Sequence, residues 1–135
     1  HYIAYYTRLS ETTENFHNDI QARFARWEPD IHEAKASWAA LASECRDLLS
    51  QRKGNEIGPL LNRNFDLRKS VYRISEGNLA MIEAARDAGA SAKFTGSGGA
   101  IVGVYEGEEM FERLTTNLAP LGVKVFKPTI EPEIP

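Results

Sequence analysis

The stretch that decides the fold reads Ala92-Lys93-Phe94-Thr95-Gly96-Ser97-Gly98-Gly99-Ala100. Strand-like residues lead into it over 91–95 and out of it over 100–105, so its glycines lie where one strand turns into the next. Because glycine adopts positive φ angles and has no Cβ, such a loop can turn several backbone N–H groups toward one anion, with a lysine and two hydroxyls beside them. The same glycines serve a plain hairpin turn equally well, and the loop taken alone favours that simpler interpretation.

The elements expected around this loop follow one another in an informative order. We expect strands over 2–6, 91–95, 100–105 and 123–127, and helices over 15–24, 29–51, 55–72, 75–88 and 107–118. The order β–(helices)–β–β–α–β predicts an α+β fold, namely a ferredoxin-like βαββαβ sandwich with extra helices inserted in the first crossover. Asn55 and Ser75 are the expected N-caps of two helices, and Gly54 is expected just after the end of the preceding one.

Bulk composition narrows the function classes. The 135 residues fit a single domain, 1–135, with one sizeable core. A net charge of −3 argues against a general nucleic-acid surface, and no apolar run approaches the ~20 residues of a membrane span, so we expect neither partner. The lone Cys45 excludes an internal disulfide and fits a reducing, cytoplasmic compartment. The chain begins with a strand and without methionine, so we expect it to be a piece of a longer protein.

Polar residues are unusually dense in one expected helix, over Asn62-Arg63-Asn64-Phe65-Asp66-Leu67-Arg68. Asn and Asp are poor helix-interior residues and cost about 0.5 kcal/mol each relative to Ala. Such local conflicts often coincide with functional sites. Ordinary surface pairs four residues apart, Asn62 with Asp66 and Asn64 with Arg68, would explain the cluster without a function.

The loop and the residues before it, Gly89 to Ala100, resemble the third signature motif of the GHMP kinases, G-A-x-x-K-x-T-G-[AS]-G-x-G-G. That family includes galactokinase, homoserine kinase, mevalonate kinase and phosphomevalonate kinase, and here the loop is one residue shorter. Within the family the sequence is most similar to the glucuronokinase-like sugar kinases, in which K-F-T-G-S-G-G-A recurs nearly verbatim. The polar helix, from Leu61 to Arg68, resembles the glucuronokinase-like form of the helix that lines the acceptor pocket.

The resemblance implies two sets of site residues. The implied phosphate-binding residues are Lys93, Thr95, Gly96, Ser97, Gly98 and Gly99. The implied substrate-binding residues are Asn62, Asn64, Asp66, Arg68, Arg23 and His17. Arg23 and His17 lie, with Asn18, in a segment similar to a V-H-S-D-x-R region that is near the sugar in such kinases. Helical spacing alone would place them on an ordinary solvent-exposed face of a helix. Arg68 is the first candidate to bind a uronate carboxylate and Arg23 is the second, because a guanidinium binds a carboxylate bidentately.

The resemblance covers only the C-terminal domain of such kinases, because the ATP-phosphate loop of their N-terminal domain does not occur in this sequence. It implies a parent enzyme that uses ATP and Mg²⁺ to phosphorylate a sugar hydroxyl, the anomeric hydroxyl of D-glucuronate. We expect the catalytic residues to lie mainly in that missing domain, which we also expect to be the partner of this chain. By itself the chain should hold no cofactor or metal and should be inactive. The alternatives are another acceptor (mevalonate, galactose or a heptose phosphate) and a non-catalytic ferredoxin-like ligand-binding module. Gly98→Val should abolish activity, at little cost in stability if Gly98 has no positive φ.

Overall fold

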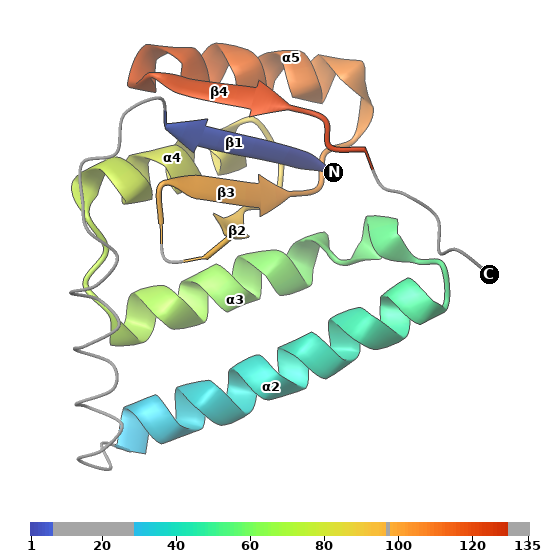
Figure 1. The fold of residues 1–135 in the computed structure, drawn as a ribbon, viewed down its shortest axis with the longest axis vertical. Helices are drawn as coiled ribbons and strands as arrows, with labels where there is room; N and C mark the ends of the chain where they lie inside the picture. Colours follow the sequence, from blue (N-terminus) through green and yellow to red (C-terminus); the bar gives the residue numbers. More distant parts are fainter. Residues whose placement is uncertain (7–28, 97, 130–135) are drawn as a thin grey trace.

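The computed structural model describes residues 1–6, 29–96 and 98–129. Its sheet has four strands in the order β2-β3-β1-β4, with every neighbouring pair antiparallel. The strands are β1 (Tyr2–Tyr6), β2 (Lys93–Phe94), β3 (Ala100–Gly103) and β4 (Val123–Phe126). This is the ferredoxin-like order, so the predicted fold class is confirmed (Figure 1).

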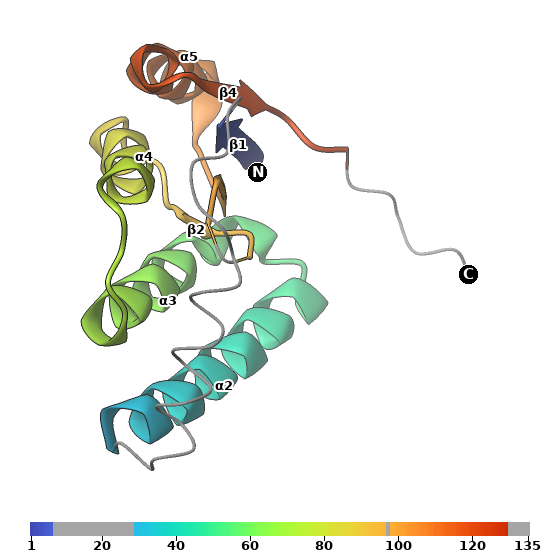
Figure 2. The ribbon, with the colours of Figure 1, turned by 60° about the vertical axis from the view of Figure 1, so that its left-hand side comes forward.

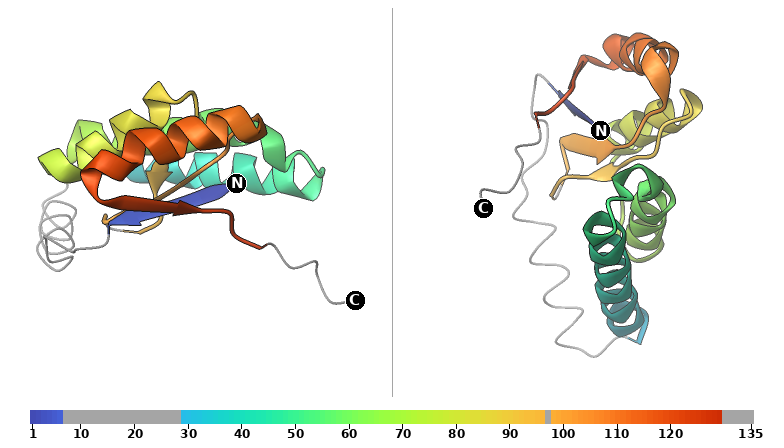
Figure 3. Two further views of the ribbon diagram at one scale, coloured as in Figure 1. Left: turned by 90° about the horizontal axis from the view of Figure 1, so that it is seen from above. Right: turned by 90° about the vertical axis from the view of Figure 1, so that its right-hand side faces the viewer.

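The helices fall into two groups around the sheet. They are α2 (Pro29–Ser50), α3 (Gly58–Val71), α4 (Glu76–Asp87) and α5 (Gly107–Leu118), with short 3₁₀ turns η1 (Gly54–Glu56) and η2 (Ala119–Leu121). Helices α4 and α5 pack together on one face of the sheet (Figures 2 and 3). Helices α2 and α3 pack against each other beside the β2 edge, where α3 contacts the strand (Figure 1). The inserted helices therefore extend the fold at the edge that carries the glycine loop.

The main core lies between the sheet and the α4–α5 layer. Side chains alternate across a strand, so Tyr2 and Ala4 are buried under the helices while Tyr5, on the other face, is exposed. From the helices, Phe65, Ile82 and Leu114 are buried in the same cluster. A smaller cluster of Ile31, Ala34 and Val71 joins α2 to α3. No helix in the described ranges is both long enough and apolar enough to cross a bilayer.

Two predicted helix ends are wrong, and both lie between α2 and α3. Helix α2 ends before Arg52, which takes the left-handed conformation (φ 61°) in place of the expected Gly54. The Lys53 N–H donates to the Leu48 carbonyl at 2.8 Å and the Arg52 N–H to Leu49 at 3.0 Å, a Schellman arrangement. Because residues 54–56 then form η1, Asn55 cannot cap α3, whose N-cap is Ile57.

The other cap prediction is confirmed. Ser75 precedes α4 in an extended conformation, and its hydroxyl oxygen accepts a hydrogen bond from the Asn78 N–H at 3.3 Å. This bond satisfies one of the free N–H groups in the first turn of the helix. It also fixes the start of α4 near the glycine loop, where Asn78 Oδ1 accepts a hydrogen bond from the Gly99 N–H.

Candidate functional site

The glycine loop is a hairpin between β2 and β3, as predicted. Phe94 pairs with Ile101, and the Thr95 N–H donates to the Ala100 carbonyl at 3.1 Å. The backbone N–H and the carbonyl of Gly99 both form hydrogen bonds as well. Its N–H donates to Asn78 Oδ1 on α4 at 3.0 Å, and its carbonyl accepts from the Tyr6 N–H of β1 at 3.0 Å. The end of the loop is therefore tied to both the helix layer and the sheet.

The glycines in this loop are not equivalent. Gly98 and Gly99 have φ angles of 142° and 81°, in the range that favours glycine. A Cβ on Gly98 would lie 2.9 Å from Asn78 Nδ2, whereas a Cβ on Gly96 would meet no atom within 4 Å. Gly98→Val was expected to cost little stability only if Gly98 has no positive φ. The φ of 142° does not meet that condition, so we now expect a loss of stability as well.

Arg68, near the end of α3, closes the other end of the loop. Its Nη1 donates to the Gly96 carbonyl oxygen at 2.6 Å. The guanidinium lies over the Tyr72 and Phe94 rings, 5.0 and 5.1 Å from their centroids. Burial lowers the pKa of Arg68, with the nearby Tyr72 acting weakly in the opposite direction. The guanidinium is thus held against two aromatic rings beside the loop, and a guanidinium suits a planar anion such as a carboxylate.

A hollow of about 280 Å³ opens next to Arg68. Its lining residues come from α2, α3 and the β2 hairpin, and they are Trp38, Asn64, Arg68, Tyr72, Lys93, Phe94, Thr95 and Gly96. Lys93 is the second cation of this hollow, and its pKa is lowered first by burial and then by the charge of Arg68. Because two cations line the same hollow, an anion bound between them would be stabilised by both.

The hollow is lined by three aromatic residues that were not predicted as site residues, Trp38, Tyr72 and Phe94. Trp38 appeared in the sequence as part of the apolar stripe of α2, and Tyr72 as the end of α3. In the structure their ring centroids lie 6.3 Å apart, and Trp38 Nε1 donates to the Asn64 carbonyl at 3.3 Å. The sequence signal that could have identified Trp38 and Tyr72 is their residue type, because tryptophan and tyrosine each combine an apolar ring with a polar atom that needs a hydrogen-bond partner.

The predicted substrate residues divide between the hollow and the packing around it. Asn64 and Arg68 line the hollow. Asn62 Oδ1 instead accepts the Ala92 N–H at 2.9 Å, and Asp66 pairs with Arg86 Nη1 at 2.7 Å. These two contacts join α3 to the start of the hairpin and to α4, and the substrate roles of their side chains stay predictions. His17, Arg23 and Ser97 lie outside the described residues.

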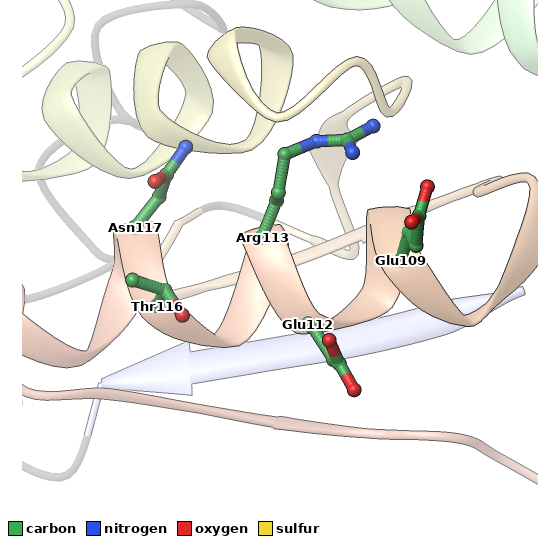
Figure 4. Close-up of a pocket in the computed structure, with 5 residues that line it drawn as sticks. All are labelled: Glu109, Glu112, Arg113, Thr116 and Asn117. Carbon is green, nitrogen blue, oxygen red and sulfur yellow. The ribbon is translucent and has the colours of Figure 1, made fainter.

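A second hollow, of about 380 Å³, lies along α5 (Figure 4). Arg113 Nε donates to the Ala88 carbonyl and Asn117 Nδ2 to the Ala84 carbonyl, each at 3.2 Å. Figure 4 shows both side chains directed toward α4. Their polar groups therefore fasten the two helices together, and we assign this hollow to packing.

Comparison with known proteins agrees with the motif in the loop. Residues 45–119, more than half of the chain, match the family "GHMP kinases C terminal". Two relatives come from Arabidopsis thaliana. "Probable glucuronokinase 2" is 40% identical over 89 residues, which cover 64% of this chain and 24% of that protein. "Glucuronokinase 1" is 34% identical over 89 residues, which cover 64% and 25%. The matched region thus spans about a quarter of either relative's length.

A solved structure extends the likeness to nearly the whole chain. L. major mevalonate kinase in complex with R-mevalonate superposes with a TM-score of 0.79 at 18% identity, covering 96% of this chain and 43% of that one. At this identity the likeness shows the fold alone. The confirmed βαββαβ order, the glycine hairpin and the family match over residues 45–119 lead to one conclusion: the chain belongs to the GHMP kinases, as their C-terminal domain.

Proposed function

We propose that this chain forms the acceptor- and phosphate-binding part of an ATP-dependent sugar kinase that phosphorylates glucuronate at its anomeric hydroxyl. The observation that carries the proposal is the juxtaposition of Arg68 and Lys93 in one aromatic-lined hollow directly beside the glycine loop. The glucuronokinases among its relatives, which match about two thirds of the chain, support the same acceptor.

The carboxylate of glucuronate is assigned to Arg68 and Lys93. A guanidinium has five N–H donors, and the bond to the Gly96 carbonyl uses only part of that capacity. Lys93 provides a second positive charge. Burial, and after it the charge of Arg68, lowers the pKa of Lys93, and a carboxylate between the two groups would offset the repulsion between them. Hydrogen bonds to charged groups contribute roughly 1.5–3 kcal/mol each, enough to select an acidic sugar over a neutral one.

The sugar ring is assigned to the aromatic part of the hollow. Trp38 and Tyr72 offer apolar ring faces, and Asn64 and Thr95 contribute polar groups at the same site. Small-molecule sites commonly combine aromatic walls with a few polar groups that fix the orientation of the ligand. With its carboxylate on Arg68, the ring would lie close to the loop at Gly96, because Arg68 bonds that residue directly.

The phosphoryl group is assigned to the loop, over residues 96–98 with Lys93 and Thr95 beside it. Phosphoryl transfer depends chiefly on positioning and on stabilising the charge of the transferred group, and loop N–H groups can do both. Gly99 was predicted for the same role, but its N–H already donates to Asn78, so we give the phosphate to the residues before it.

ATP and Mg²⁺ are assigned to the remainder of the kinase. Across residues 1–6, 29–96 and 98–129, no three His, Cys, Asp or Glu side chains come together where they could hold a metal ion. When bound, ATP would supply the phosphoryl group and Mg²⁺ would neutralise part of its charge. This chain orients the acceptor, so by itself it should not catalyse.

The test is ADP release by the complete kinase with glucuronate, galactose and mevalonate in parallel. The 135-residue chain alone serves as the negative control. Turnover that requires glucuronate, and none by the chain alone, is the expected result. Turnover with galactose or mevalonate but not with glucuronate would refute the acceptor assignment while keeping the kinase. No turnover with any of the three would refute the proposed function.

A further inference from the structure

Asn78 occupies the third position of α4, where its backbone is fixed. The Asn78 N–H donates to the Ser75 hydroxyl oxygen at 3.3 Å, which anchors the first turn of the helix. From that position its side chain reaches the glycine loop, where Oδ1 accepts the Gly99 N–H at 3.0 Å. Asparagine is a weak helix former, so a residue chosen for helix stability alone would differ.

The amide group of Asn78 also limits the space at Gly98. Its Nδ2 lies 2.9 Å from the place that a Cβ on Gly98 would occupy. The neighbouring strand strengthens the same region, because the Tyr6 N–H donates to the Gly99 carbonyl at 3.0 Å and the Tyr6 hydroxyl donates to the Gly77 carbonyl. Asn78 therefore belongs to a small network that fixes the exit end of the loop from two sides.

We infer that Asn78 is a positioning residue for phosphoryl transfer, an inference that rests on the proposed function. By holding the Gly99 N–H it fixes the last peptide of the loop, next to the loop residues to which the phosphate is assigned. Its second contribution is that the Asn78 side chain carries no charge. An aspartate would accept the same hydrogen bond from Gly99 but would place a negative charge beside the incoming phosphate.

Three variants of the complete kinase test this inference. Asn78→Ala should lower kcat about tenfold or more, while the KM for glucuronate changes less than about twofold, because the carboxylate site is untouched. Asn78→Asp keeps an acceptor for Gly99, so its melting temperature should stay within a few degrees of the parent. Its KM for ATP should nevertheless rise, and the rise should shrink at high salt, which screens charge.

Asn117→Ala is the matched control. Asn117 also uses its side-chain amide to join two elements, donating to the Ala84 carbonyl at 3.2 Å, but it lies on α5 in the packing hollow. We expect this variant to lose a similar amount of stability and to keep kcat within about twofold of the parent. Equal losses of kcat in Asn78→Ala and Asn117→Ala would reduce Asn78 to a packing role and overturn the inference.

Hydrogen exchange of the Gly99 amide, measured by NMR on the 135-residue chain, gives a readout that needs no activity. The amide should be protected in the parent and in Asn78→Asp and should exchange faster in Asn78→Ala. Unchanged exchange in Asn78→Ala would overturn the inference and leave the proposed function intact. Absence of turnover by the unmodified kinase with every acceptor would instead overturn the proposed function, and the catalytic role of Asn78 with it.

Discussion

Arg68 Nη1 and the Gly96 carbonyl oxygen are 2.6 Å apart, so one side chain of α3 both lines the hollow and holds the glycine loop. This bond places the acceptor and phosphate assignments next to each other through a single residue. An anion that draws the Arg68 guanidinium toward itself therefore acts on the loop as well. The geometry links recognition of the acceptor to the shape of the phosphate site.

Replacing Arg68 should affect acceptor binding more than it affects the fold. In the complete kinase we expect Arg68→Ala to raise the KM for glucuronate by about tenfold to a hundredfold, because a charged hydrogen bond contributes roughly 1.5–3 kcal/mol. Arg68→Lys should recover only part of the loss, because lysine cannot bind bidentately. Steady-state kinetics measure both. Lys69→Ala, which removes an exposed cation from the same helix, is the control. An equal effect of Lys69→Ala would point to general charge instead of a site.

Replacing Lys93 should weaken glucuronate binding while stabilising the fold at neutral pH. Burial, aided by the Arg68 charge, lowers the pKa of Lys93, so the unfolded chain binds this proton more tightly than the folded chain. Stability rises with pH wherever the unfolded state binds more protons. The cost of charged Lys93 is therefore present at pH 7 and disappears as the pH rises from the lowered pKa through about 10.4, the ordinary value.

Urea unfolding of the Lys93→Met chain at neutral and alkaline pH measures this effect. Its gain in the free energy of unfolding over the parent should be largest at neutral pH and should shrink as the pH rises. Lys124→Met, an exposed lysine on β4, controls for the loss of one positive charge. A gain that is independent of pH would contradict the assignment to Lys93 titration. Calorimetry on the complete kinase measures the expected loss of glucuronate affinity.

The loop glycines should respond differently to the same added methyl group. Gly96→Ala meets open space, so its melting temperature should stay within a few degrees of the parent. Gly98→Ala combines a φ of 142° with a contact of 2.9 Å to Asn78 Nδ2, and we expect a loss of about 1–3 kcal/mol. Urea unfolding of the two variants side by side measures the difference. Equal stabilities would show that the loop rearranges freely.

Gly103 should be the least replaceable glycine for folding. A Cβ there would lie 1.8 Å from the Ser91 carbonyl oxygen, the same atom that accepts the buried Tyr2 hydroxyl at 2.7 Å. Gly103→Ala must push two backbone segments apart, so we expect a loss of roughly 4 kcal/mol or more. Val102→Ala, on the opposite face of β3, should cost only about 1 kcal/mol. Circular dichroism during urea unfolding compares the two, and a Gly103→Ala chain as stable as the Val102→Ala chain would contradict this packing.

The sequence predicted the fold because its signals were local and mutually consistent. The β-branched and aromatic residues of β1, the serine cap at Ser75 and the glycine hairpin are each local signals, and together they allow few topologies. The link between α2 and α3 was predicted incorrectly because Arg52, a residue that rarely adopts a positive φ, takes the position expected for a glycine. The requirement for glycine at 103 had no local signal, since it depends on a distant carbonyl.

The location of the candidate site could be predicted from the sequence, but only some of the residues that line it could. Arg68, Lys93 and the loop could be found because their residue types imply anion binding. The contacts of the Asn62 and Asp66 side chains could not be predicted, because they depend on how α3 packs against α4 and β2. Trp38 sits on the apolar stripe of α2, and periodicity cannot tell a core position from one that lines a hollow.

The central place of β1 in the sheet has a consequence for the order in which this chain folds. β1 pairs with β3 and β4, partners that follow it by about a hundred residues or more, so neither pairing can form until most of the chain has been synthesised. Helices α2 and α3 contact each other locally and can assemble earlier. During translation β1 must therefore wait for both of these partners with its aromatic side chains uncovered, and apolar surface exposed in this way favours aggregation of the nascent chain.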